Sequence, residues 1–405
     1  MTTTEQVRLA EYTTLRLGGP AARFVGAATE ADLIAAVTAA DAEGEPVLVL
    51  GGGSNLVVAD AGFPGVVVRA VSGGVRFAAG EGAVDVTAAA GQDWDELVRT
   101  CLAEGLSGVE CLSGIPGSAG ATPIQNVGAY GQDVAETVTA VRAYDRLAGK
   151  VVRLGPADLD FGYRTSMFKR QAAAALASGG ALAGARGAEG DARAGVSSGD
   201  GEVPVGGALD DCDGAGPTVA AATGRFVVLE VTFRLPASPL SAPVRYAELG
   251  RQLGIAEGDR VPVADARAAV LDLRRGKGMV LDDRDPDTRS AGSFFTNPIV
   301  PVTRFDALRE RLGATVRIPH WPGGPDEVKL SAAWLIEQAG FTRGFRLAGD
   351  PAAAQISTKH TLALTNPGGA TTAGLIRLAR TIRDGVQAEF GIELTNEPTL
   401  VGTSL

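Results

Sequence analysis

Two glycine-rich segments hold the residues of this chain that are best suited to binding phosphate. Residues 51–55 read GGGSN and follow the strand-like segment 46–50, whereas residues 114–131 contain five glycines and two prolines. Glycine lets backbone N–H groups approach a ligand closely, and such groups bind anions. We therefore predict that the two loops converge on one extended cofactor that carries phosphate.

The two loops match none of the commoner nucleotide or nucleophile signatures. Leu56 stands where the dinucleotide fingerprint G-x-G-x-x-G has its third glycine, and no segment satisfies the P-loop pattern. Pro116 stands two residues before Ser118, where a nucleophile elbow requires glycine. Ordinary turns are the alternative for either loop taken alone, but two such loops together favour a binding site.

The elements that must position these loops alternate irregularly, which is typical of an α+β fold. Residues 65–69 and 225–231 are strand-like runs rich in valine. Thr29 and Asp93 each stand three residues before an acidic side chain, as in a capping box, and Gly391 suits the end of a helix. The pattern predicts five helices, over residues 32–42, 94–104, 264–274, 331–338 and 371–389.

Length and charge restrict the class of protein. The 405 residues are enough for about two to three domains. A formal charge of −10 and a pI near 4.9 argue against nucleic acid or an anionic membrane as a partner, because a polyanion would be repelled. The polar N-terminus does not resemble a signal peptide, and no run reaches the ~18 apolar residues of a membrane helix. We expect a cytoplasmic monomer without membrane insertion.

The cysteines and histidines do not indicate a metal site. Cys101, Cys111 and Cys212 lack C-x-x-C spacing and are odd in number, which suits a reducing compartment rather than a disulfide framework. Because His320 and His360 are the only histidines, we expect no zinc site and a structural role for His360.

Residues 171–224 differ abruptly in composition from the rest of the chain. Alanine and glycine make up more than half of this segment, and it contains no aromatic residue. Such a segment cannot bury enough apolar surface to offset its ordering entropy. We predict an insertion that is disordered or loosely packed, with a weakly helical start.

Several segments in a fixed order resemble the flavin-dependent UDP-N-acetylenolpyruvoylglucosamine reductases of bacterial cell-wall synthesis, the MurB type. The resemblance spans nearly the whole chain apart from the insertion. The matching segments are residues 12–20 (YTTLRLGGP), both glycine loops, residues 162–169 (GYRTSMFK), 292–298 (GSFFTNP) and 329–338 (KLSAAWLIEQ), and Glu397-Pro398.

The resemblance implies a two-part FAD-binding domain of the vanillyl-alcohol-oxidase (PCMH) type, followed by a C-terminal α+β substrate-binding domain. It implies FAD subdomains at 1–72 and 73–278, the second interrupted by the insertion. The substrate domain would span 279–390, and residues 391–405 would return to the second subdomain. In this family NADPH reduces the flavin and leaves, and flavin N5 then gives hydride to the enolpyruvyl substrate, which becomes UDP-N-acetylmuramate.

Three residues from distant segments resemble the family's catalytic groups. Hydride arriving at an enolpyruvyl group creates an enolate-like anion, which needs a cation, a hydrogen-bond donor and finally a proton. By resemblance Arg164 supplies the cation, Glu397 a protonated carboxyl, and Ser293 the proton. A turn serine in a Gly-Ser pair is the alternative for Ser293.

The resemblance also names binding residues, for which structural roles are the alternative. Tyr163, Lys277, Asn297 and Gln338 look like contacts to the nucleotide-sugar substrate or, for Lys277, to NADPH. The expected FAD contacts lie in the two glycine loops: Gly51, Gly52, Gly53, Ser54, Asn55, Gly114, Ile115, Pro116, Gly117, Ser118, Gly120, Ala121, Thr122, Gln125, Asn126, Gly128, Ala129 and Tyr130.

The sequence differs from the family pattern in one region, and two alternative functions remain open. In one branch of the family a tyrosine after the Tyr-Arg motif folds over the substrate, whereas this chain has the aromatic-free segment 171–224 there. A different flavin oxidoreductase acting on an alcohol or aldehyde is one alternative, but no histidine before His320 could tether FAD. A flavin-binding protein without catalysis is the other, and it would have no use for the three catalytic candidates.

Overall fold

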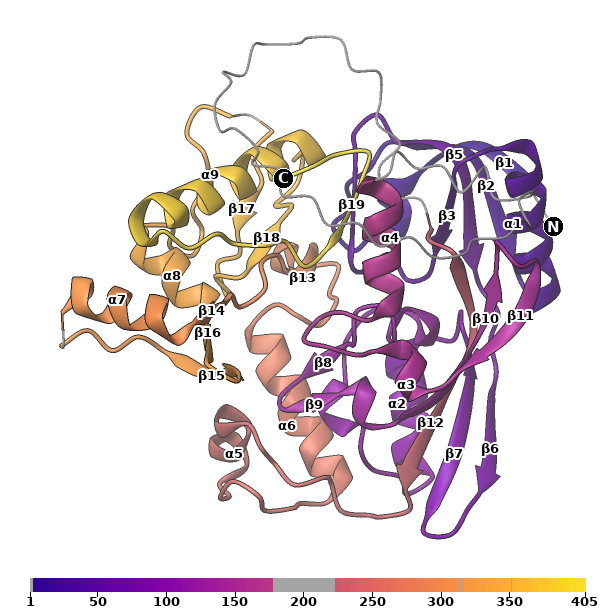
Figure 1. Ribbon diagram of the computed structural model, residues 1–405, viewed down its shortest axis with the longest axis horizontal. Helices are drawn as coiled ribbons and strands as arrows, with labels where there is room; N and C mark the ends of the chain where they lie inside the picture. The colour runs from indigo at the N-terminus through magenta and orange to yellow at the C-terminus, as the bar shows by residue number, and fades with distance from the viewer. Residues whose placement is uncertain (1–2, 178–222, 314, 351) are drawn as a thin grey trace, which may run out of the picture.

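The first sheet contains the start of the chain, and the first glycine loop follows one of its strands. The computed structural model describes residues 3–177, 223–313, 315–350 and 352–405, so most of the predicted insertion, residues 178–222, and Cys212 lie outside the described residues (Figure 1). The sheet has the order β1-β2-β5-β3, with β1–β2 antiparallel and the other pairs parallel. Its strands are β1 Thr3–Arg8, β2 Pro20–Ala27, β3 Val47–Leu50 and β5 Phe63–Ala70.

Helix α1, Glu30–Glu43, covers this sheet through one apolar face. Leu33, Ala36, Val37 and Ala40 are buried, which is the spacing of a helix that packs on one side. The predicted capping box is confirmed, because the Thr29 hydroxyl accepts from the Asp32 N–H and the Asp32 carboxylate accepts from the Thr29 N–H.

The second sheet is antiparallel throughout and carries the second glycine loop above its core. Its order is β11-β10-β12-β7-β6. Trp94 of helix α2, Trp94–Ala103, packs on Phe233 with ring centroids 5.6 Å apart, and its indole N–H donates to the Leu112 carbonyl. The strands are β6 Val75–Ala79, β7 Ala83–Ala89, β10 Val138–Asp145, β11 Lys150–Leu154 and β12 Phe226–Pro236.

Four helices and a small hairpin connect this sheet to the rest of the molecule. Buried Val263, Ala266, Ala269 and Val270 show that one face of α6 packs inward. The hairpin pairs β8, Gly128–Ala129, with β9, Gln132–Asp133. The helices are α3 Pro156–Leu159, α4 Met167–Ala177, α5 Ala247–Leu253 and α6 Val263–Gly276.

The C-terminal part has its own core between two small sheets and three helices. The sheets have the orders β13-β18-β17 and β14-β16-β15, and both are antiparallel. Phe294, Phe295, Leu330 and Ile382 are among the buried side chains of this core. The elements are β13 Ser290–Ser293, β14 Ile299–Pro301, β15 His320–Gly324, β16 Glu327–Leu330, β17 Gln355–Ile356, β18 Ala363–Thr365, α7 Val302–Leu312, α8 Ala332–Gln338 and α9 Thr372–Phe390.

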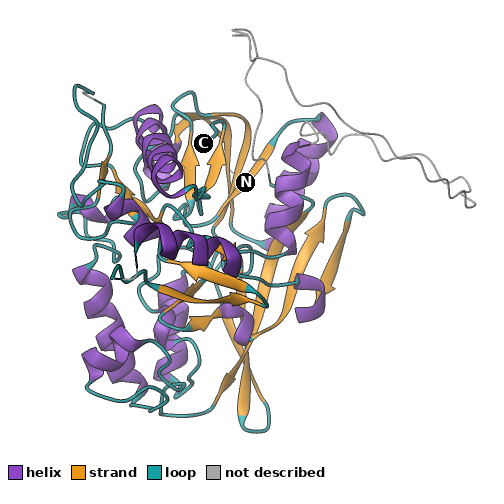
Figure 2. Cartoon of the chain, turned by 60° about the vertical axis from the view of Figure 1, so that its left-hand side comes forward, coloured by secondary structure: helices purple, strands orange, loops and turns teal. Residues whose placement is uncertain are grey.

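The end of the chain returns to the first glycine loop. Strand β19, Thr399–Val401, pairs in parallel with β4, Leu56–Val58, which directly follows the loop. The Thr399 N–H donates to the Asn55 carbonyl at 2.9 Å. The mixture of sheets and helices in Figure 2 is an α+β architecture, as expected. No helix within the described ranges is both long and apolar enough to span a bilayer.

The five predicted helices are confirmed within three residues at each end, as α1, α2, α6, α8 and α9. Gly391 ends α9 in the left-handed conformation, and the strands at 46–50, 65–69 and 225–231 correspond to β3, β5 and β12. Helix α7 was not predicted, although Phe305 and Leu308 form its buried face and Pro301 and Gly313 lie at its two ends.

Removing the carboxylate of Asp60 is expected to lower the free energy of unfolding by about 1 kcal/mol, because it caps a helix of the C-terminal part. Its two oxygens accept from the N–H groups of Thr372 and Ala373, each at 2.8 Å, at the start of α9. Urea unfolding of Asp60→Ala measures the effect. Asp384→Ala, exposed on the same helix, is the control and should stay within about 0.5 kcal/mol of the native protein.

Candidate active site

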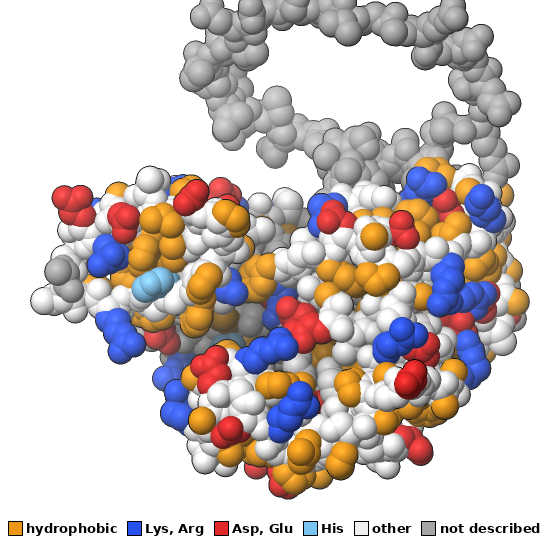
Figure 3. Space-filling view, turned by 60° about the horizontal axis from the view of Figure 1, so that its bottom comes forward, with side chains coloured by type: hydrophobic (Ala, Val, Ile, Leu, Met, Phe, Trp, Pro, Cys, Tyr) orange, Lys and Arg blue, Asp and Glu red, His pale blue; other side chains and the backbone are white. Residues whose placement is uncertain are grey.

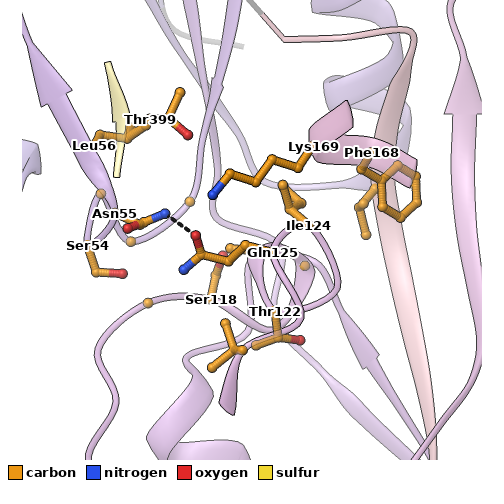
Figure 4. A pocket seen from close by; sticks show the side chains of 18 of the residues that line it. Ser54, Asn55, Leu56, Ser118, Thr122, Ile124, Gln125, Phe168, Lys169 and Thr399 are labelled. Carbon is orange, nitrogen blue, oxygen red and sulfur yellow. Dashed lines mark hydrogen bonds between the residues drawn. The ribbon is translucent and has the colours of Figure 1, made fainter. Parts of the chain in front are cut away.

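The structure brings the two glycine loops into direct contact at the carboxyl end of β3. A Cβ atom on Gly52 would lie 2.6 Å from the Gly117 Cα, so the second loop leaves no room for a larger residue at position 52. Gly53 has φ +61°, and a Cβ atom on it would lie 1.8 Å from the Tyr12 carbonyl oxygen. Across the gap the Asn55 amide donates to the Gln125 side-chain oxygen (Figure 4). Such close backbone approach suits the cradle of an extended anionic ligand.

The loops line a cavity of about 350 Å³ that continues between α4, β12 and β13. Predicted residues from both loops and all three catalytic candidates lie on its wall. Those residues are Gly51, Gly52, Gly53, Ser54, Asn55, Ile115, Pro116, Gly117, Ser118, Gly120, Ala121, Thr122, Gln125, Gly128, Arg164, Ser293 and Glu397. The residues present therefore fit a phosphate-bearing cofactor, with backbone amides at the loops and apolar walls beyond them.

Arg164 is held by groups on every side of its guanidinium. Nη2 donates to the Gly128 carbonyl at 2.5 Å, and Nη1 donates to the Asn126 carbonyl at 3.4 Å. Nε lies 3.3 Å from Glu397 Oε1, and Nη1 lies 3.6 Å from Asp133 Oδ1. Only 21% of the Arg164 side chain is exposed, and its φ of +54° is in the left-handed region. The surroundings thus fix this cation in a conformation that costs about 1–2 kcal/mol.

Ser293 lies at the end of β13, next to the segment that carries Glu397. The Glu397 N–H donates to the Phe294 carbonyl at 2.8 Å, which joins residues distant in sequence. The Ser293 side chain is half-buried and lines the cavity. Among the described residues its hydroxyl has no hydrogen-bond partner, so the proton is available to a bound ligand.

Burial and nearby cations act against each other on the two carboxyl groups of this site. Burial raises the pKa of Glu397 above its ordinary value, while the charges of Arg164 and Lys169 oppose the rise. Burial likewise raises the pKa of Asp133, opposed by Arg164 and Lys329. Glu397 is the less exposed of the two, with 16% of its side chain exposed against 46% for Asp133.

The predicted substrate contacts lie outside the residues that line the cavity. Tyr163 is 38% exposed, with the Lys329 ammonium 4.8 Å from its ring centroid. Lys277 forms an ion pair of 2.5 Å with Glu248. Asn297 accepts from the Ala332 N–H at the start of α8, and Gln338 is exposed at the end of that helix. Figure 3 shows a hollow in this face of the molecule, with both basic and acidic side chains around it.

Four of the predicted cofactor residues also lie outside the cavity lining. They are Gly114, Asn126, Ala129 and Tyr130. The Asn126 amide donates to the Gly162 carbonyl and its oxygen accepts from the Ala135 N–H, so its side chain links loops. The Tyr130 ring meets the Tyr246 ring edge to face at 5.4 Å.

Three basic residues that line the cavity were not predicted, namely Lys169, Arg225 and Arg274. Lys169 lies within the quoted GYRTSMFK segment, and Arg274 lies three residues before Lys277. The Arg274 guanidinium donates to the Met279 carbonyl at 2.7 Å, while its buried Nε has no partner among the described residues. Burial lowers the pKa of Arg274, with Tyr130 and Asp95 opposing. Lys169 lies in a segment that matches the family, and Arg274 lies in a basic cluster. The sequence could have indicated both on these grounds, but the spacing of charges alone does not show which side chain points into the cavity.

Enlarging Gly52 to valine is expected to weaken binding of the FAD that the resemblance implies, because its Cβ would meet the Gly117 backbone rather than a flexible side chain. Overpacking of this kind costs about 1–3 kcal/mol, which is roughly 5- to 150-fold in Kd. Fluorescence titration of the apoprotein with FAD measures the change. Gly26→Ala is the control, because nothing lies within 4 Å of the added Cβ. An unchanged Kd for the Gly52 variant would show that the contact between the loops does not shape the site.

Comparisons with known proteins agree on one family for the two parts of the chain. Residues 285–401 match the family model for the UDP-N-acetylenolpyruvoylglucosamine reductase C-terminal domain, and residues 21–155 match that for an FAD binding domain. UDP-N-acetylenolpyruvoylglucosamine reductase of Thermobifida fusca is 49% identical over 404 residues, covering 98% of both chains. The enzyme of that name from Salinispora arenicola is 49% identical over 402 residues, covering 99% of this chain and 96% of the relative.

A solved structure extends the likeness to the fold. The crystal structure of UDP-N-acetylenolpyruvylglucosamine reductase (MurB) from Thermus caldophilus aligns with a TM-score of 0.57 and 23% identity. The alignment covers 99% of this chain and all of that one. It supports the fold of the two-part FAD domain and the C-terminal part.

Proposed function

The chain belongs to the UDP-N-acetylenolpyruvoylglucosamine reductase family, and from this premise we propose that it uses NADPH to reduce the enolpyruvyl ether of UDP-N-acetylglucosamine to UDP-N-acetylmuramate. Membership of this family makes it an FAD-dependent reductase of peptidoglycan precursor synthesis, and replaces the alcohol-oxidase and non-catalytic alternatives. The observation that carries the detailed proposal is the meeting of Arg164, Ser293 and Glu397 at one cavity wall.

The two glycine loops would hold FAD, which when bound supplies a carrier that accepts hydride from a nicotinamide and gives it to a carbon. Residues 51–55, Ile115, Gly117 and Ser118 would offer backbone N–H groups to the pyrophosphate. Asn55 and Gln125 are placed to donate or accept beside it. The side chains of Leu48, Ala90 and Val228 give the cavity apolar walls.

The residues beyond the loops would handle the charge that develops on the substrate. Arg164, fixed by four neighbouring oxygens, would orient the substrate carboxylate and stabilise the enolate-like transition state. Glu397, whose pKa burial raises, would donate a hydrogen bond to the same developing charge. Ser293 would give its hydroxyl proton to the carbon next to the carboxylate, because a carbanion is basic enough to take it.

The proposal takes the remaining substrate contacts from both the FAD domain and the C-terminal part. Tyr163 and Lys277 belong to the expected FAD domain, and Asn297 belongs to the C-terminal part. Of the four proposed substrate contacts, Gln338 has the least support, because its side chain is exposed at the C-terminal end of α8. As a partner we propose the nucleotide sugar, bound by a monomer.

Anaerobic stopped-flow absorbance separates the two half-reactions. The holoenzyme should bleach its flavin absorbance with NADPH, and the reduced enzyme should regain it when UDP-N-acetylenolpyruvoylglucosamine is added without oxygen. NADH in place of NADPH tests the choice of nicotinamide. Reoxidation that requires oxygen and ignores the enolpyruvyl substrate would refute the proposal.

A further inference from the structure

Lys169 is a half-buried cation of the cavity that has no role in the proposed reaction. It lies in the first turn of α4, and in Figure 4 its side chain extends into the cavity toward Asn55 and Gln125. Its Nζ donates to the Glu397 carbonyl at 3.0 Å and to the Arg164 carbonyl at 3.4 Å. One amine thus joins the main chains of both charged catalytic candidates, across a separation of 228 residues to Glu397.

The partners of Lys169 differ from those of the next residue on the helix. Arg170 pairs with the Asp160 carboxylate at the surface, where both side chains are well exposed. No carboxylate of the described residues lies within 4 Å of the Lys169 amine. Burying a charge without a paired carboxylate costs free energy, and neutral donors would satisfy two carbonyls equally well. The positive charge is therefore not explained by the hydrogen bonds alone.

The positive charge of Lys169 acts on the carboxyl group of Glu397. The charged groups that face this carboxyl are Arg164, from the loop before α4, and Lys169 from α4 itself. Asp133 of β9 meets the other side of Arg164, and Lys329 of β16 acts on Asp133. Tyr163 is the remaining titratable side chain nearby. Burial alone would favour a neutral Glu397, and the two cations oppose it.

We propose that Lys169 is a positioning residue, which holds the main chains of Arg164 and Glu397 together and adds a positive charge to the surroundings of the Glu397 carboxyl. It acts through these two residues and does not itself exchange a proton with the substrate. Its bond to the Arg164 carbonyl also supports the left-handed backbone of that residue. The inference rests on the proposed function only in giving Glu397 a part in the reaction.

The test is an infrared titration of the Glu397 carboxyl in the FAD-loaded protein, with the band assigned by its loss in Glu397→Gln. Removing a positive charge favours the neutral acid, so Lys169→Met should move the titration of this band upward by about one pH unit. Lys169→Gln keeps a donor but not the charge and should give the same shift. Lys169→Arg keeps the charge and should titrate close to the native protein. Arg170→Met is the control on the same helix and should leave the band unchanged.

The charge-removing variants give the decisive outcome. If the band titrates as in the native protein in Lys169→Met or Lys169→Gln, the proposal is overturned, even where thermal stability falls. The pH dependence of substrate-driven reoxidation is measured alongside. If Glu397→Gln keeps the native profile, the proposed part of Glu397 in the reaction fails, while the infrared shift still decides the role of Lys169.

Discussion

Replacing Ser293 with alanine is expected to slow reoxidation of the reduced enzyme by its enolpyruvyl substrate by about 10²- to 10⁴-fold, which is the usual contribution of a positioned proton donor. The change removes one oxygen atom from the cavity wall and leaves the glycine loops intact. The NADPH half-reaction should therefore keep its native rate. Single-turnover absorbance measurements of both half-reactions on the same preparation give the comparison.

The control for this variant is Thr296→Ala. Thr296 lies three residues further along the same segment, its hydroxyl bonds the Thr395 carbonyl, and it does not line the cavity. It should leave both half-reactions unchanged. A Ser293→Ala enzyme that reoxidises as fast as the native one would remove this hydroxyl from the reaction, and the half-buried serine would then be a turn residue.

The parts of the fold that the sequence predicts are those specified by neighbouring residues. Helix α1 is an example, because Thr29 and Asp32 cap it and Leu33, Val37 and Ala40 repeat at helical spacing. The convergence of the two glycine loops was also predicted, because both loops are rich in glycine and suit one phosphate-bearing ligand. In the structure Gly52 and Gly117 lie in close contact.

The parts of the site that the sequence does not predict depend on contacts between distant segments. Asp133 resembles any acidic loop residue, and only the short hairpin β8–β9 brings it to 3.6 Å from Arg164. Lys169 is one of two adjacent basic residues, and the turn of α4 decides which of them faces the cavity. Asn126 and Gln338 are the opposite case, because their segments match the family but their side chains do not line the cavity. The Asn126 side chain bonds another loop, and the Gln338 side chain is exposed.

Replacing Arg164 with methionine is expected to lower kcat/KM for the enolpyruvyl substrate by about 10²- to 10³-fold, the loss typical of one group that stabilises a developing oxyanion. Methionine keeps much of the apolar stem but none of the bonds to Gly128 and Glu397. Arg164→Lys should recover only part of the loss, because an ammonium cannot reproduce the planar fork of donors. Native kcat/KM in Arg164→Met would contradict the assignment of this cation.

Comparing Arg164→Met with Arg164→Gly separates the chemical role of this residue from its backbone strain. Both variants lose the guanidinium and should lose activity to the same extent. Glycine alone relieves the left-handed φ of +54°, so Arg164→Gly should be more stable than Arg164→Met by about 1 kcal/mol in urea unfolding. A glycine variant that is less stable than the methionine variant would show that packing of the side-chain stem outweighs the strain. The expected result is a stability gain with no return of activity, because the strain is a cost of placing the charge at this position.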